Sequence, residues 1–161
     1  IGPVIEPLGL LRIKGYVGKL SQPASFEDGG EMLRALFGGQ FTNLSAGDWT
    51  AFARRTFEER DGKLVASYDP ALAQNLAAFD IDQPLPPLWP QFDALARVPV
   101  MVIRGENSDL LSRDTVAAMR ERRGDLQVVE VPAQGHAPLL MEDDIIARIG
   151  QFIVECDRRR A

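Results

Sequence analysis

Two short apolar runs constrain the fold of this chain more than any other feature. The first run, Val100 to Ile103, leads through Arg104-Gly105 into a polar loop that contains Asp109. The second run, Leu126 to Val131, leads into a loop that contains His136, and a helix-like segment lies between the runs. Strands joined by a helix are typical of a βαβ unit with parallel strands. The pattern therefore predicts an α/β fold with both loops at one edge of the sheet.

The two loops also resemble motifs of a known family. The segment Arg104 to Ser112 (RGENSDLLS) resembles the acid loop of the α/β-hydrolase family, and Gly135 to Pro138 (GHAP) resembles its histidine loop. The likeness is to the cap-bearing group of serine hydrolases and esterases, lactonases and carbon–carbon bond hydrolases. It implies that Asp109 is the acid of a catalytic triad and that His136 is its base. Glu106, in the same loop, is the rival acid.

The nucleophile of that family lies upstream of the acid, on a G-x-S-x-G elbow, and this sequence contains no such elbow. Ser45, in the stretch NLSAG, is the nearest candidate. It lacks the first glycine, follows no strand-like run and is better explained as a helix cap. We therefore expect the chain to be the C-terminal half of an α/β-hydrolase fold, without the half that carries the nucleophile.

The order of the segments predicts two parts. Residues 1–87 are predicted to form a helical cap or lid, and residues 88–161 the C-terminal part of the core, with the last two parallel strands and their helices. The first expected cap helix begins at Pro7, with Leu8, Leu11 and Tyr16 on its apolar side, and a loop with Gly29-Gly30 follows at Ser21–Gly30. Further helices are expected at Glu31–Phe37, after a capping box of Ser45 and Asp48, and at Asp69–Phe79, with an extended stretch at Lys63–Tyr68. Ser112 is expected to cap the next helix and Glu142-Asp143-Asp144 to begin the last one, whose inward stripe includes Ile145 and Ile153.

Aromatic residues follow Ser45 at helical spacing, and two explanations stay open for them. Trp49, Phe52 and Phe57 fall on one side of the predicted helix, which is typical of packing within a cap. In the family that the chain resembles, however, the cap lies over the active site. The resemblance therefore implies that some of Trp49, Phe52 and Trp89 line an apolar substrate pocket.

Composition limits the classes of partner. The net charge of −5, with no basic stripe, argues against nucleic acid, and no run of about 18 apolar residues is present to span a membrane. The single cysteine, Cys156, excludes an internal disulfide and favours a reducing compartment, the cytoplasm. No cofactor and no metal ion are expected.

Three functions are compatible with these features. The first is hydrolysis of an ester, a lactone or a carbon–carbon bond through a Ser-His-Asp triad whose serine lies outside this chain. The second is a haloalkane dehalogenase or epoxide hydrolase with an aspartate nucleophile, although an epoxide hydrolase needs cap tyrosines and only Tyr16 and Tyr68 are available. The third is a non-catalytic fragment that self-associates through the open edge of Val100 to Ile103. The expected partners are thus a small-molecule substrate and either the missing N-terminal half or a second copy.

Overall fold

A computed structural model describes residues 2–77, 80, 83 and 85–158, so the predicted helix end at Phe79 lies outside the described residues. The chain divides into two compact units: a helical unit, Pro7–Pro84, and a core unit made of Ile1–Glu6 and Leu85–Ala161. Residues ahead of Pro7 join the core unit because their backbone is hydrogen-bonded there. The Glu6 N–H donates to the carbonyl of Leu110 at 3.1 Å, and the Leu88 N–H donates to that of Pro3 at 2.6 Å.

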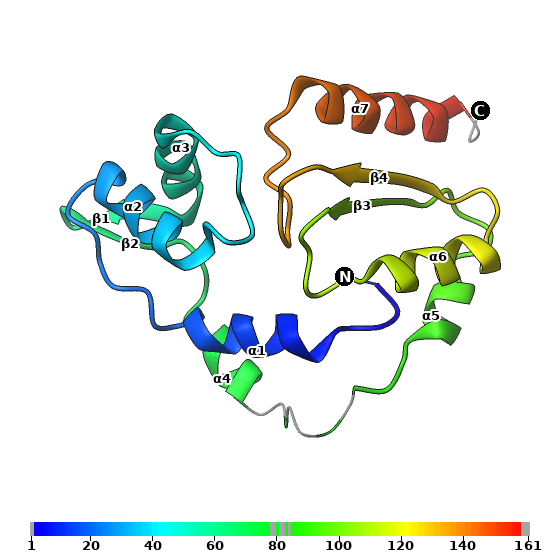
Figure 1. Ribbon diagram of the computed structural model, residues 1–161, viewed down its shortest axis with the longest axis horizontal. Helices are drawn as coiled ribbons and strands as arrows, with labels where there is room; N and C mark the ends of the chain where they lie inside the picture. Colours follow the sequence, from blue (N-terminus) through cyan, green and yellow to red (C-terminus); the bar gives the residue numbers. More distant parts are fainter. Residues whose placement is uncertain (1, 78–79, 81–82, 84, 159–161) are drawn as a thin grey trace. The chain divides into compact units, whose positions relative to one another are not determined.

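The core unit contains a parallel pair of strands, as predicted. Strand β3 (Met101–Gly105) pairs with β4 (Gln127–Val131) in a register that runs from Met101 opposite Gln127 to Gly105 opposite Val131. Helix α6 (Arg113–Arg122) connects them (Figure 1). Both strands therefore end at the same edge of the sheet, and the loops that follow them begin there.

Each face of this sheet is covered by a different helix layer, because alternate side chains of a strand point to opposite faces. Helix α7 (Asp143–Arg158) covers one face, and α5 (Trp89–Asp93) and α6 cover the other (Figure 1). The cluster under α7 comprises Met101, Ile103, Val129, Val131, Ile145 and Ile149. The cluster on the other face comprises Val100, Val102, Val128, Phe92, Met119 and Leu126.

The ends of the core helices follow the predicted signals. The Ser112 hydroxyl accepts the N–H of Thr115 at 3.2 Å and so begins α6, and two acidic residues occupy the first turn of α7. The predicted inward stripe of α7 is only partly correct. Ile145 is buried, whereas Ile153 is 54% exposed, because a two-stranded sheet covers only a narrow stripe of a helix this long.

The helical unit is built from four helices and one hairpin among its described residues. These elements are α1 (Pro7–Tyr16), α2 (Phe26–Phe37), α3 (Ala46–Thr56), β1 (Phe57–Arg60), β2 (Lys63–Ala66) and α4 (Ala71–Ala77) (Figure 1). Strands β1 and β2 are antiparallel, and the turn residues Asp61 and Gly62 have φ angles of 51° and 72°. Two left-handed residues are what a tight hairpin turn requires. Phe57 therefore begins a strand, rather than extending the predicted helix.

Helix α2 begins at Phe26, five residues before the predicted start. Ser25 caps it by accepting the Asp28 N–H at 3.0 Å. The glycine pair Gly29-Gly30, which suggested a loop, lies inside the helix where α2 meets α3. A β carbon at Gly30 would lie 3.0 Å from the backbone of Trp49. The glycines thus permit close helix packing instead of breaking the helix.

Candidate functional site

The two predicted catalytic residues lie in loops that leave the same edge of the sheet. We call residues 106–112 the acid loop and residues 132–140 the histidine loop. Asp109 follows the end of β3 by four residues, His136 follows the end of β4 by five, and both side chains are half-buried. The strand ends Gly105 and Val131 are opposite each other in the sheet register.

Backbone hydrogen bonds join the two loops directly. The N–H of Glu106 donates to the carbonyl of Val131 at 2.9 Å, and the N–H of Asn107 donates to that of Gln134 at 2.8 Å. Asp109 and His136 each lie two residues beyond this second bond. The structure therefore brings together the two loops that the sequence placed at one edge.

Glycine at position 105 makes this close approach possible. A β carbon built there would lie 2.1 Å from the carbonyl oxygen of Gly135 and 2.4 Å from that of Gln134. Both distances are far inside van der Waals contact, so no larger residue fits without moving the histidine loop. The glycine of the Arg104-Gly105 motif is therefore required for packing of the histidine loop against the end of β3.

Gln134 holds the histidine loop from within, a role that was not predicted from the sequence. Its side chain is 3% exposed, and its amide oxygen accepts the N–H of Leu139 at 2.7 Å. Its amide nitrogen donates to the Glu142 carboxylate. These bonds close residues 134–142 around His136. The only sequence signal was a polar residue directly before the Gly-His pair, which is too common to single out.

Arg104 has the corresponding place in the acid loop, and it was also missed as a functional residue. Its guanidinium is buried, and it donates to backbone carbonyls on both sides of Asp109 and to the Glu130 carboxylate. The available signal was a charged residue near the end of an otherwise apolar strand. Such a residue requires partners once it is buried.

Two other polar side chains have structural tasks. The rival acid Glu106 accepts the N–H of Ala133 at 3.0 Å and pairs with Arg113 at 3.4 Å, so its carboxylate ties the two loops together. Ser45 forms the predicted capping box with Asp48 at the start of α3, as the sequence indicated. The Ser45 hydroxyl donates to the Asp48 carboxylate at 2.7 Å, and these hydrogen bonds from Ser45 lower the pKa of Asp48.

The aromatic residues predicted to line a pocket lie in different units. Trp49 is 3% exposed and belongs to an aromatic cluster in the helical unit, with ring centroids 6.0 Å from Phe52 and 6.3 Å from Phe41. Trp89 lies in the core unit, edge-on to Phe92, with the Arg122 guanidinium 4.4 Å from its ring centroid. Trp49 therefore contributes to packing. Contact of Trp49, Phe52 or Trp89 with a substrate stays a prediction.

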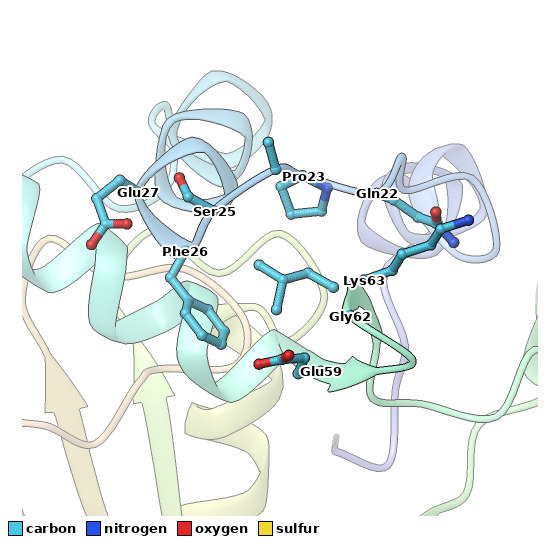
Figure 2. A pocket seen from close by; sticks show the side chains of 10 residues that line it. Gln22, Pro23, Ser25, Phe26, Glu27, Glu59, Gly62 and Lys63 are labelled. Carbon is cyan, nitrogen blue, oxygen red and sulfur yellow. The ribbon is translucent and has the colours of Figure 1, made fainter.

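A hollow of 480 Å³ lies within the helical unit, between the start of α2 and the β1–β2 hairpin (Figure 2). Phe26 and Leu64 line it with apolar side chains, whereas Glu27, Glu59 and Lys63 supply charges. The residues that line it come from 22–27 and 59–64. Neither the acid loop nor the histidine loop contributes to this hollow.

The described residues contain neither a metal-binding cluster nor a membrane-spanning helix. Across residues 2–77, 80, 83 and 85–158, no group of three His, Cys, Asp or Glu side chains is arranged to hold a metal ion. In the same part of the chain, no helix has both the length and the apolar character needed to cross a membrane.

Comparisons with known proteins agree on the fold. No protein-family profile matches the chain. The 3-hydroxybutyrate-oligomer hydrolase of Cupriavidus necator is 34% identical over 94% of this chain and 54% of its own length. The crystal structure of an α/β hydrolase from Novosphingobium aromaticivorans is 36% identical, with a TM-score of 0.82 over 94% of this chain and 53% of that one. E-2-(acetamidomethylene)succinate hydrolase is 25% identical, with a TM-score of 0.65 over 95% of this chain and 55% of its own.

The chain thus spans about half the length of the relatives that it matches. The matching part is their C-terminal half. The fold predicted from the two strand-and-loop motifs is confirmed by these likenesses. This chain therefore has the fold of the C-terminal half of an α/β hydrolase.

Proposed function

We propose that Asp109 and His136 are the acid and the base of a hydrolase that cleaves a carboxylic ester. The observation that carries this proposal is the hydrogen bond from the Asn107 N–H to the Gln134 carbonyl at 2.8 Å. It joins the acid loop to the histidine loop two residues from each catalytic side chain. Glu106, the alternative acid, already binds Ala133 and Arg113, which favours Asp109.

The chemistry follows from what a hydroxyl nucleophile needs. A serine hydroxyl becomes nucleophilic when a neighbouring imidazole removes its proton, and His136 is the only histidine of the chain. His136 would take the proton as the hydroxyl oxygen attacks the ester carbonyl, and would return it to the alcohol that leaves. Water would then release the acid by the same route. Asp109 would fix the tautomer of His136 and stabilise the imidazolium.

An ester is favoured over the other substrates by the relatives. The name of the Cupriavidus protein states that it hydrolyses oligomers of 3-hydroxybutyrate, and hydroxy acids oligomerise through ester bonds. Both tyrosines of the chain, which an epoxide hydrolase would need as proton donors, have contacts within the helical unit. The Tyr68 hydroxyl accepts the Gly18 N–H at 2.7 Å, and the Tyr16 ring packs edge-on against Phe37 with centroids 4.9 Å apart. We therefore place the aspartate-nucleophile alternatives second.

The nucleophile is proposed to come from the other half of the fold, which would also extend the sheet. Among the described residues, β3 has β4 as a neighbour on one side, and its residues Met101 to Ile103 are only half-buried. An open strand edge favours pairing with another strand. A cytoplasmic location is proposed on a separate ground, because the single cysteine allows no internal disulfide.

The experiment is ester hydrolysis by the longest natural polypeptide that contains this chain, with the linear dimer of 3-hydroxybutyrate as substrate. His136→Ala is expected to abolish turnover. Asp109→Asn is expected to lower kcat by about 10⁴-fold, the loss typical of a triad acid. Glu106→Gln is the matched control: the amide oxygen of glutamine can still accept the Ala133 N–H that joins the two loops, so this variant should retain most activity. Loss in Glu106→Gln but not in Asp109→Asn would reverse the assignment of the acid, and no ester hydrolysis by the unchanged protein would refute the proposal.

A further inference from the structure

Arg104 has more partners than its place in a short strand requires. Its guanidinium is 6% exposed, and each of its nitrogens donates to a partner. Nε donates to the carbonyl of Leu111 at 2.8 Å, one terminal nitrogen donates to that of Glu106 at 3.1 Å, and the other donates to that of Ser108 at 3.3 Å. All three carbonyls belong to the acid loop.

These carbonyls need partners because the loop leaves the sheet and forms no strand ladder. A buried carbonyl without a donor is costly, and the planar guanidinium supplies several donors in a fixed geometry. The carbonyls of Ser108 and Leu111 lie on either side of Asp109 in the sequence. The position of the Arg104 guanidinium therefore determines the path of the backbone at Asp109.

The guanidinium is itself anchored from the neighbouring strand. Arg104 is opposite Glu130 in the sheet register and donates to its carboxylate at 2.8 Å. Arg113, in the first turn of α6, donates to the same carboxylate at 3.2 Å. The Glu130 carboxylate of β4 thus binds both Arg104, in the strand that leads into the acid loop, and Arg113, in the helix that follows this loop.

We propose that Arg104 is the positioning residue of the catalytic acid: its guanidinium holds the acid loop in the form in which Asp109 reaches His136. This inference rests on the proposed function, since it takes Asp109 and His136 as partners. Arg104 would not contact the substrate. Its effect would pass through the backbone of the acid loop to the imidazole.

The core unit offers a matched control for the loss of a buried arginine. Arg123 is 8% exposed and donates to the carbonyls of Leu95 and Val98 and to the Asp125 carboxylate. Its partners lie outside both catalytic loops. Replacing either arginine by lysine keeps the charge but removes the planar fork. The two substitutions should therefore lower stability alike, and only Arg104→Lys should affect His136.

The experiment uses the full 161-residue chain and the ¹⁵N NMR signals of its only histidine. The two ring nitrogens of neutral imidazole report which of them carries the proton, and a carboxylate partner at Nδ1 selects the Nδ1–H form. We expect the unchanged chain to hold the Nδ1–H form. Asp109→Asn and Arg104→Lys should both shift the population toward Nε2–H, whereas Arg123→Lys should leave it as in the unchanged chain.

Each outcome bears on one of the two proposals. If Asp109→Asn leaves the tautomer unchanged, the proposed pair fails, and the role of Arg104 falls with it. If Asp109→Asn shifts the tautomer but Arg104→Lys does not, only the role of Arg104 is overturned. If Arg104→Lys does not fold, hydrogen exchange of the Arg104 Nε–H in the unchanged chain decides. Protection as strong as that of the β3 amides supports the proposal, and exchange as fast as that of exposed arginines refutes it.

Discussion

A β carbon at Gly105 would lie 2.1 Å from the carbonyl oxygen of Gly135. The last residue of β3 and the residue before His136 therefore touch through their backbones alone. The acid loop begins directly after this contact, and the Glu106 carboxylate and the Asn107 N–H add hydrogen bonds beside it. The relative position of the acid loop and the histidine loop is set by backbone contacts, and these contacts require a glycine at the end of β3.

Gly105→Ala is predicted to destabilise the core unit, because the added methyl group must displace the histidine loop. Overpacking of this kind costs about 1–3 kcal/mol. Urea denaturation of the chain measures the loss. Gly150→Ala, inside α7, is the control: a β carbon built there meets no atom of the described residues within 4 Å, and alanine is the better helix former. It should be as stable as the unchanged chain or more so. Equal effects of the two substitutions would contradict the contact at Gly105.

The capping box at the start of α3 predicts a dependence on pH. Hydrogen bonds from the Ser45 side chain and backbone lower the pKa of Asp48 below the ordinary value of 3.8. A lowered pKa in the folded state means that ionised Asp48 stabilises the fold above pH 3.8 and that this contribution is lost as the pH falls through the lower, folded pKa. Asp48→Asn should therefore be less stable than the unchanged chain near neutral pH, and the difference should shrink on acidification.

Thermal unfolding of the two chains across the acidic range tests this prediction. Ser45→Ala removes the other half of the box and should cost about 1 kcal/mol at neutral pH, as N-cap losses usually do. A difference between Asp48→Asn and the unchanged chain that stays constant with pH would show that the ionised carboxylate contributes nothing.

Local signals in the sequence were enough to predict the strands and the helix starts of the core unit. The β-branched runs at Val100 to Ile103 and Leu126 to Val131 predicted β3 and β4, and Ser112 predicted the start of α6. These signals are local because caps and strand periodicity act within a few residues. The same signals predicted that Asp109 and His136 lie in loops at one edge of the sheet. The register of β3 and β4 agrees, because their last residues, Gly105 and Val131, are opposite each other.

The features that were missed depend on contacts between residues distant in the sequence. Gly29-Gly30 suggested a loop, yet both residues lie inside α2. They are glycines because the neighbouring helix α3 leaves no room for a side chain at these positions. Arg104 binds the Glu130 carboxylate, 26 residues away, and the backbone carbonyl of Gln134 accepts the N–H of Asn107 from the other loop. Composition and periodicity carry no information about such pairs.

The outer face of α7 predicts how the chain behaves in solution. Ile146, Ile153 and Val154 are 51%, 54% and 49% exposed, and their spacing places them along one side of the helix. Apolar side chains gathered on one exposed face mark a surface that is covered in the functional assembly. The chain on its own is therefore expected to self-associate, and replacing Ile146 and Ile153 by glutamate should shift it toward monomer.

Light scattering at several concentrations measures this shift. Since both side chains are largely exposed, the double substitution should change the free energy of unfolding by no more than about 0.5 kcal/mol for each site. Leu36→Glu is the matched control, because Leu36 is 48% exposed on α2, in the other unit, and should leave association unchanged. If the unchanged chain is monomeric at every concentration, the prediction that the outer face of α7 mediates self-association is wrong. If the double variant associates as strongly as the unchanged chain, copies meet through another surface, for which the open edge of β3 is the strongest candidate.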